Sequence, residues 1–469
     1  MTTAPVRPSQ LTREERAALG KSARAAAPLE SHAEHLTDGR PDPVDLLESQ
    51  ATSRVTELVP IRYGRMLASP FAFYRGGALI MASDLSRTPR SGLTVQLCGD
   101  AHLSNFGIYA TPERRLFFDI NDFDETHPGP FEWDVKRLVA SLAVASRSNG
   151  FSGKQRRKVL LAAGAAYRTA MKELAGQRNL EVWYTHLDMD DAALQIQKQF
   201  GAEDSARARA AIDKARRRNS LQALGKLTTM VDGKARIRSD PPLLVPVEEL
   251  WGADVAEDVY RELGRVLESY GTTLQSDRRH LLAQFELVQI ARKVVGVGSV
   301  GTRAFVLLMQ GIDGQDPLFL QAKQAQESVL APYTGGSADD HHGRRVVTGQ
   351  HLMQASSDIF LGWQRVPGID GVDRDYYLRQ LRDGKGSVIV ENLTPTTMKF
   401  YGEVCARTLA RAHARSGDRV AIAAYLGSKT RFDEAIADHA HAYADQNERD
   451  HAALGDAVAT GRVTARSDL

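Results

Sequence analysis

The fold is decided by the stretch Leu97-Cys98-Gly99-Asp100-Ala101-His102-Leu103-Ser104-Asn105-Phe106-Gly107. A second stretch follows it closely, Phe118-Asp119-Ile120-Asn121-Asp122-Phe123-Asp124-Glu125. Between them, two apolar, β-prone segments flank a polar turn within residues 106–120, which predicts a β-hairpin. We expect this hairpin to bring Asp100, Asn105 and Asp122 to one end.

These residue types suit phosphoryl transfer. That reaction needs a carboxylate to orient the attacking hydroxyl and hard oxygen ligands to hold Mg²⁺ against the phosphates. In this hypothesis Asp100 is the base, and Asn105, Asp122 and Asp124 supply the metal ligands. His102 would contact a phosphate or order the loop. The alternative is a pair of turns in which Asp and Asn side chains cap backbone groups.

The composition is that of an ordinary globular protein, with 42% hydrophobic and 25% charged residues among 469. The formal net charge of +2 does not indicate nucleic acid or a membrane surface as a partner. No apolar run approaches the ~18 residues that a membrane-spanning helix needs, and the N-terminus lacks the apolar core of a signal peptide. Cys98 and Cys405 provide neither a disulfide framework nor a CxxC metal site. We expect a cytoplasmic protein.

Four segments are predicted along the chain. They are an N-terminal helical extension (1–69), a helical segment with the two loops (70–283), a β-rich nucleotide lobe (284–393) and C-terminal helices that complete the helical lobe (394–469). Within them we expect a capping box at Thr12 and Glu15, one helix over 71–84, a chain break at 127–130, an amphipathic helix over 132–148 and mostly helix over 179–270. The basic stretch 207–218 is predicted to be a solvated helix face.

A glycine loop lies in the β-rich segment, where Gly296, Gly298, Ser299 and Gly301 stand in Gly-x-Gly-Ser-x-Gly. This motif alone is weak. A dinucleotide-binding loop requires a helix directly after the glycines, but here the pattern predicts strands on both sides. A hairpin over nucleotide phosphates, with a lysine on the next strand, fits better. Lys323 would then bind the phosphates and approach the carboxylate of Asp122 within salt-bridge or phosphate-bridged distance. The alternative is an edge-strand lysine in solvent. No acidic partner for this lysine is evident.

The two loops resemble the catalytic and metal loops of protein kinases, and the glycine loop resembles theirs, but the order along the chain is reversed. A circular permutation would restore the order. Leu409-Ala410-Arg411-Ala412-His413 is similar to the helix end that precedes the catalytic loop in aminoglycoside and choline kinases. The resemblance implies that Asp134, twelve residues after Asp122, is structural and ties the following helix to the catalytic loop. It also implies a two-lobed α+β fold with a small antiparallel β lobe and a larger helical lobe.

Taken whole, the chain resembles a bacterial family known as domain of unknown function 2252. The stretches that carry this resemblance are Phe73-Tyr74-Arg75-Gly76, residues 99–107, residues 121–125, residues 296–301 and Tyr443-Ala444-Asp445-Gln446. The family brings no assigned activity, so the function is predicted from the motifs.

The leading hypothesis is an ATP- and Mg²⁺-dependent phosphotransferase that acts on a hydroxyl of a small molecule or a protein. Three alternatives stay open at this point. They are nucleotidyl transfer from the same site, a nucleotide-binding regulator without turnover, and a metal-dependent hydrolase that uses Asp100, His102, Asp122 and Asp124. The hydrolase hypothesis leaves the glycine loop and Lys323 without a role.

Overall fold

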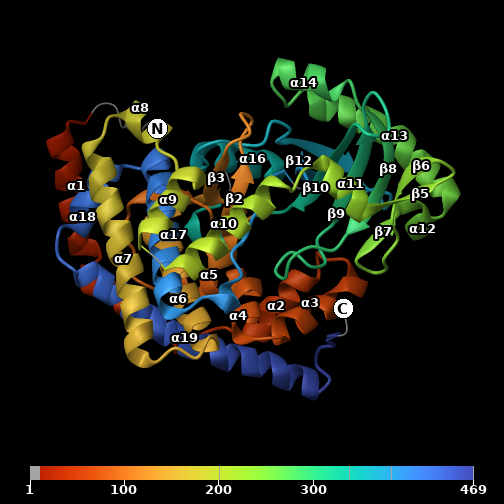
Figure 1. Cartoon of the computed structure of the whole chain (residues 1–469). Coiled ribbons are helices and arrows are strands. Elements are labelled where there is room, and N and C mark those ends of the chain that lie inside the picture. Colours follow the sequence, from red (N-terminus) through yellow and green to blue (C-terminus); the bar gives the residue numbers. More distant parts are fainter. Residues whose placement is uncertain (1–10, 200, 337–338, 382, 468–469) are drawn as a thin grey trace, which may run out of the picture.

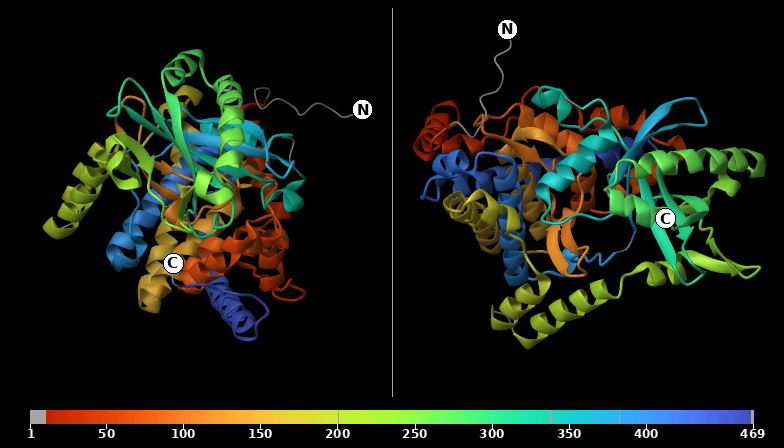
Figure 2. Two further views of the ribbon diagram at one scale, coloured as in Figure 1. Left: turned by 90° about the vertical axis from the view of Figure 1, so that its right-hand side faces the viewer. Right: turned by 90° about the horizontal axis from the view of Figure 1, so that it is seen from above.

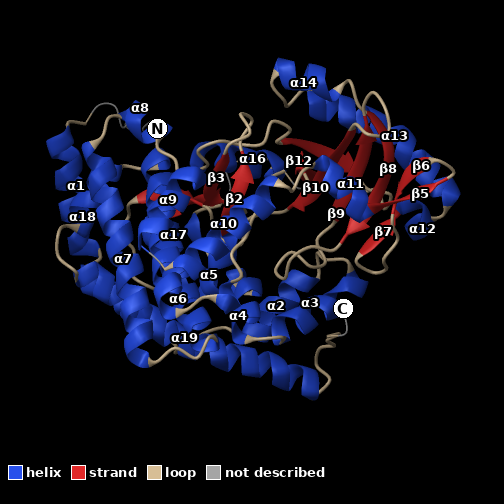
Figure 3. Ribbon diagram, in the orientation of Figure 1, coloured by secondary structure: helices blue, strands red, loops and turns tan. Residues whose placement is uncertain are grey.

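The computed structural model describes residues 11–199, 201–336, 339–381 and 383–467. The protein is a mixed α+β structure with a larger helical part and small antiparallel sheets, which confirms the predicted fold class at that level. The largest sheet lies at one end of the molecule and most helices gather at the other (Figures 1 and 3). Residues 202–237 run along one side, from the helical part towards the sheet (Figure 2). None of the helices in the described residues has the length and apolar character needed to cross a membrane.

The N-terminal segment forms short helices that pack against the C-terminal ones, with α1 on α18 and η2 on α19. The predicted capping box of α1 is confirmed, because the Thr12 hydroxyl accepts from the Glu15 N–H and the Glu15 carboxylate accepts from the Thr12 N–H. The first ten residues of the predicted extension lie outside the described residues. The elements are α1 (Arg13–Ala26), η2 (Leu29–Ala33), α2 (Pro43–Ala51), η3 (Thr56–Leu58), α3 (Val59–Leu67), α4 (Pro70–Gly76) and α5 (Ala78–Ser86).

The prediction of one helix over 71–84 is wrong, because the chain turns between α4 and α5 at Gly77. Two adjacent glycines weaken a helix, and here they also permit a close approach. A Cβ on Gly76 would stand 2.7 Å from the sulfur of Met66 on α3. The turn therefore packs α4 tightly against α3.

Helix α6 (Phe131–Ser148) is the centre of the helical part and is buried over 131–146. The predicted helix over 132–148 is confirmed, but it is buried on all sides rather than on one apolar face, because the charged residues of α6 find partners inside the protein. Glu132 accepts hydrogen bonds from Ser91, and Asp134 accepts them from the loop after β1. Around it pack α7 (Gly153–Gly176), α17 (Pro395–Ser416), α18 (Arg419–Leu426) and α19 (Arg431–Ala459).

The main sheet has six strands in the order β11-β12-β10-β9-β8-β7, and all neighbours are antiparallel. Side chains alternate between its faces. Leu307 and Met309 of β9 join a core with α13, whereas Val306 and Leu308 join a core with α11. The strands are β7 (Leu244–Pro246), β8 (Glu286–Lys293), β9 (Ala304–Gln310), β10 (Pro317–Ala325), β11 (Gly362–Pro367) and β12 (Asp373–Gln380).

The segment 179–270 is mostly helical, as predicted, but it also contains strands that the sequence did not predict. Strands β5 (Thr228–Val231) and β6 (Lys234–Ile237) form a hairpin, and β7 adds an edge to the main sheet. The remaining helices are α8 (Asn179–Tyr184), α9 (Met189–Gln199), α10 (Ala202–Arg216), α11 (Ser220–Leu227), α12 (Val247–Trp251), α13 (Ala253–Gly271), α14 (Ser276–Leu282), α15 (Ala331–Thr334), α16 (His342–Met353) and η5 (Val390–Asn392).

Two strand pairs position the loops of interest. The predicted hairpin is confirmed as β2 (Phe106–Ala110) and β3 (Leu116–Ile120), with Phe106 opposite Ile120. Strand β1 (Thr94–Leu97) pairs with β4 (His127–Pro130), so the predicted chain break at 127–130 is wrong. Proline is tolerated there because β4 pairs with a strand on one side only. The loop after β1 therefore lies beside the loop that leads into β4.

Candidate functional site

The loop after β1 takes its shape from Asp134 on α6. One oxygen of the Asp134 carboxylate accepts a hydrogen bond from the Cys98 N–H at 2.8 Å, and the other accepts one from the Gly99 N–H at 3.1 Å. Gly99 has a φ of 83°, and a Cβ there would stand 2.1 Å from the carbonyl oxygen of Glu125. Glycine is therefore required, and it lets the two loops touch.

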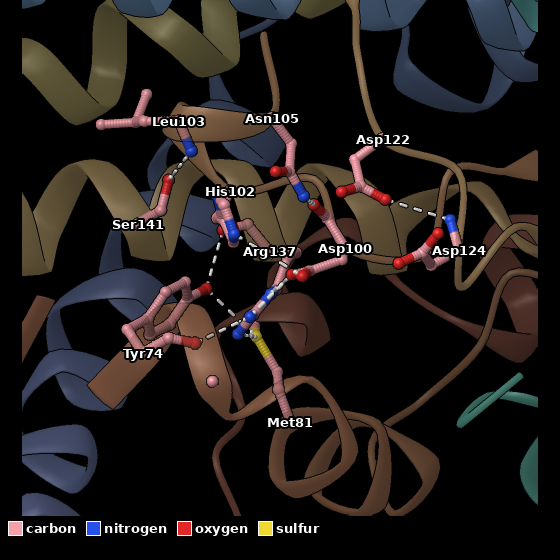
Figure 4. A network of polar contacts seen from close by, with 12 residues as sticks. Tyr74, Met81, Asp100, His102, Leu103, Asn105, Asp122, Asp124, Arg137 and Ser141 are labelled. Carbon is pink, nitrogen blue, oxygen red and sulfur yellow. Dashed lines mark hydrogen bonds and ion pairs between the residues drawn. The ribbon is translucent and has the colours of Figure 1, made fainter. Parts of the chain in front are cut away.

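The carboxylate of Asp100 is held by Arg137, also on α6 (Figure 4). Nη2 of Arg137 lies 2.7 Å from Oδ1 of Asp100, and Nε donates to the same oxygen at 2.9 Å. The guanidinium is itself fixed, because it donates to the carbonyl of Tyr74 and lies 4.0 Å from the centre of that residue's ring. Burial alone would lower the pKa of Arg137, but Asp100 outweighs it and the pKa is raised. Asp100 therefore presents an oriented carboxylate.

His102 lies beside Asp100, with Nε2 3.6 Å from Oδ2 of that carboxylate. Burial lowers the pKa of His102 to about 4, although Asp100 acts in the opposite direction. The imidazole is therefore neutral at pH 7 and adds no positive charge for a phosphate. Since its backbone N–H also donates to the carbonyl of Asp100, its observed contacts order the loop.

Asn105, just before β2, and Asp122, just after β3, face the same space at one end of the β2–β3 hairpin (Figure 4). The backbone N–H of Asn121 donates to the carbonyl of Asn105 at 2.8 Å and closes the hairpin. The side-chain nitrogen of Asn105 donates to the carbonyl of Asp100 at 2.7 Å. This bond leaves the amide oxygen of Asn105 as the atom available to a cation.

Lys323 of β10 reaches this loop across the molecule, 199 residues away from Asp124 in sequence. Its ammonium contacts the carboxylate of Asp124 and lies 3.8 Å from that of Asp122, as the sequence predicted for Asp122. Tyr377 on β12 donates a hydrogen bond to Asp124 at 2.7 Å. Burial would raise the pKa of Asp122, but Lys323 and Arg379 outweigh it and the pKa is lowered. Asp124 is thus the acidic partner of Lys323 that the sequence did not reveal.

The glycine loop connects β8 to β9 and is therefore the turn of an antiparallel hairpin. No helix follows Gly301, so the dinucleotide-binding alternative is wrong. The loop is fastened to the N-terminal helices. Val55 donates its N–H to the carbonyl of Gly301 at 2.8 Å, and Arg65 donates to that of Gly296 at 2.8 Å. A Cβ on Gly298 would stand 3.0 Å from the carbonyl oxygen of Arg75.

These loops enclose one cavity of about 470 Å³. Most of the predicted site residues line it, namely Asp100, His102, Asn105, Asp122, Asp124, Gly296, Gly298 and Ser299. Two do not. Gly301 packs against Arg54, and Lys323 is buried beneath the carboxylates that it contacts. The cavity is rich in charge, which suits a polar, ionic ligand.

Several cavity residues were not predicted as functional. They are Arg54, Arg62 and Arg75 from the N-terminal helices, and Glu125 directly after Asp124. Burial raises the pKa of Glu125 to about 7, although the N–H of Val329 donates to its carboxylate at 2.8 Å. Arg75 stands in a stretch that carries the family resemblance, but nothing in the local pattern distinguishes Arg54 or Arg62 from solvated helix charges.

The end of α17 reaches the same loop from behind. His413, the last residue of the Leu-Ala-Arg-Ala-His stretch, lies with Nε2 3.2 Å from Oδ2 of Asp134. Its Nδ1 lies 2.8 Å from the hydroxyl of Tyr167 on α7. Asp134 therefore joins α6, α17 and the loop after β1, the structural role that the resemblance to small-molecule kinases implies.

The described residues contain no group of three or more His, Cys, Asp or Glu side chains placed to hold a metal ion together. The hydrolase hypothesis needs such a group from Asp100, His102, Asp122 and Asp124. In the structure Asp100 pairs with Arg137 and Asp124 with Lys323 instead. These ion pairs give the hydrolase alternative no support.

Comparison with known proteins gives one match. A family model described as "Uncharacterized protein conserved in bacteria (DUF2252)" matches residues 54–457. No curated protein and no solved structure matches the chain. The matched range contains every residue that lines the cavity except Gln50 and Ser53.

Proposed function

The chain belongs to the DUF2252 family, and because that family is described only as uncharacterized, we propose its function from the site: an ATP- and Mg²⁺-dependent phosphotransferase that acts on a hydroxyl group. One observation carries the proposal. The β2–β3 hairpin brings Asp100, Asn105 and Asp122 to one cavity, and Lys323 arrives 3.8 Å from Asp122 from a distant sheet. A lysine, a glycine hairpin, a carboxylate base and an Asn/Asp pair are the parts that phosphoryl transfer uses.

We further propose that the fold is a circularly permuted form of the kinase fold. From residue 285 onward the chain supplies the glycine hairpin, the lysine strand and helix α17, and residues 97–125 then supply the catalytic and metal loops. The contact between His413 and Asp134 supports this order, because it joins the end of α17 to the catalytic loop. The N-terminal segment, which stands between the two halves in sequence, packs on the C-terminal helices and lines the cavity.

Asn105 and Asp122 fit a Mg²⁺ ion, since an amide oxygen and a carboxylate are hard ligands and proteins usually supply only one or two carboxylates to this ion. The ion would neutralise phosphate charge. Lys323 and the glycine loop bind the phosphates in this proposal, and Asp124 keeps the lysine in place. Asp100, held by Arg137, orients the acceptor hydroxyl and takes its proton as the new oxygen–phosphorus bond forms.

The test is binding of ATP with and without Mg²⁺ to the full chain. In the wild type we expect Mg²⁺ to tighten ATP binding, and in Asp122→Ala we expect that gain to disappear while the thermal unfolding curve stays cooperative. The matched control is Asp438→Ala, which removes an exposed carboxylate paired with Arg157. An unchanged dependence on Mg²⁺ in Asp122→Ala would contradict the metal assignment.

Turnover is followed with ATP labelled at either the γ- or the α-phosphate. Transfer of the γ-label supports the proposal, whereas transfer of the α-label identifies nucleotidyl transfer. Lys323→Ala should lower kcat/KM by ~100-fold, because it removes a positioned charge from the phosphates. ATP binding with no transfer to any alcohol tested would favour a regulator without turnover.

A further inference from the structure

Three arginines of the N-terminal helical segment form one side of the cavity. We call Arg54, Arg62 and Arg75 the arginine wall. Their hydrogen bonds go to neutral groups: Arg54 donates to the carbonyl of Val300, and Arg62 donates to the side chain of Gln50 and the carbonyl of Gly76. Among the residues that the structure describes, none of the three guanidinium groups forms an ion pair with a carboxylate. The wall therefore holds positive charge without a protein counter-ion.

Arg62 shows how costly this arrangement is. Its side chain is 0% exposed, yet both Nε and Nη1 lack a hydrogen-bond partner within the described residues. Burial, together with the nearby Arg54, holds the pKa of Arg62 well below its ordinary value. A buried cation without a partner is strongly unfavourable, and an unpaired polar group inside a protein calls for an explanation. An anionic ligand in the cavity would supply the missing partner.

The charges in the cavity are segregated. The wall comes from the N-terminal helices, and the carboxylates come from the loops after β1 and β3. The carboxylates that act on Arg54 across the cavity are Glu125 and Asp124, and on Arg75 the cavity carboxylate is Asp100. Arg54 thus interacts with the loop after β3 and only Arg75 with Asp100, so an anion bound at Arg75 would lie on the side of Asp100, where an acceptor hydroxyl has to approach.

We propose that the arginine wall binds a phosphate group carried by the acceptor, so that the substrate is a phosphorylated alcohol. This inference rests on the proposed phosphotransferase function. The nucleotide has contacts of its own in the proposed function, since Lys323 and a Mg²⁺ ion held by Asn105 and Asp122 would bind its phosphates from other elements of the site. Arginine suits the second role because its planar fork of N–H donors matches phosphate oxygens.

The first measurement is calorimetric binding of inorganic phosphate to the full chain without Mg²⁺ or nucleotide. The wild type should bind, and Arg62→Met and Arg75→Ala should each weaken binding by ~10-fold or more, since each removes charge-assisted hydrogen bonds. The matched control is Arg407→Ala, which removes a surface arginine paired with Glu173. It should bind phosphate as the wild type does. Absence of binding in the wild type, or equal binding in the variants, overturns the proposal.

The second measurement separates the acceptor from the nucleotide as the source of the phosphate. Protein saturated with Mg²⁺–ATP should still bind inorganic phosphate, and Arg75→Ala should retain wild-type affinity for Mg²⁺–ATP. Competition between phosphate and ATP, with weaker ATP binding in Arg75→Ala, would assign the wall to the nucleotide and overturn the proposal. A wild type that binds phosphate but never Mg²⁺–ATP would retain the anion site and overturn the proposed function instead.

Discussion

The protein buries arginines in two different ways. Arg40 lies between two carboxylates, with Nε 2.6 Å from Asp84 and Nη2 2.6 Å from Asp450, and so joins the N-terminal segment to α5 and α19. Arg62 in the arginine wall is buried more deeply than Arg40 and has no carboxylate partner in the described part of the chain. The first arrangement satisfies every charge inside the fold. The second leaves charge directed at a cavity, which is what a binding site requires rather than what a core requires.

The largest loss of stability is expected from removing Arg40, the arginine that pairs with two carboxylates. Arg40→Ala leaves Asp84 and Asp450 buried without their cation, and removing one partner of such a pair costs ~3–5 kcal/mol. We expect the free energy of unfolding, measured in urea, to fall by that amount. A loss below about 1 kcal/mol would show that Arg40 does not hold these elements together.

Glu125 extends the comparison to a buried acid. Its pKa is raised from 4.5 to about 7 by burial, so the folded protein keeps a proton that the unfolded chain releases between those values. The free energy of unfolding should therefore fall as the pH rises from 4.5 to 7, by about 3 kcal/mol, and then level off. Glu125→Gln has no such proton to lose, so its curve should lack this fall. Parallel pH profiles for the two proteins would contradict the assignment.

The smallest change in stability, and one of opposite sign, is expected for Arg62 of the arginine wall, which has no carboxylate partner in the described part of the chain. Arg62→Met removes a buried cation that has no counter-ion and keeps similar volume, so the free energy of unfolding should rise or change by less than about 1 kcal/mol. Denaturation by urea without added anions measures this change. A loss of stability as large as that of Arg40→Ala would mean that Arg62 is structural. The distinction between Arg40 and the arginine wall would then fail.

Periodic and local signals explain what could be predicted. The β2–β3 hairpin and strands β8 to β12 follow from alternating apolar residues and turn residues, and the hairpin alone places Asn105 beside Asp122. The sequence predicted that Lys323 lies close to Asp122, because the glycine-loop and metal-loop motifs each imply a fixed place around one nucleotide. Asp134 was recognised by its spacing from Asp122, and the structure shows its bonds to the loop.

The features that the sequence did not predict share one physical cause, since each depends on contacts between distant segments. Strand β4 contains two prolines and forms only because β1 supplies a partner. Residues 244–246 become β7 by adding to the edge of β8. Arg54 lies in the turn after α2 and Arg62 lies on α3, and solvated arginines occupy such positions too. Only the packing of the glycine loop on the N-terminal helices turns the two into cavity residues.

The packing of α6 on the C-terminal helices has a consequence for the synthesis of the chain. Helix α6 packs against α17 and α19, yet about 250 residues separate the end of α6 from the start of α17. At ~5–20 residues per second, a ribosome needs on the order of 10 to 50 s to produce that interval. Throughout it the part of α6 that packs on α17 and α19 has no native partner. The nascent chain is therefore a candidate client for chaperones that shield apolar segments, and Asp134 gains His413 as a partner only after translation of α17.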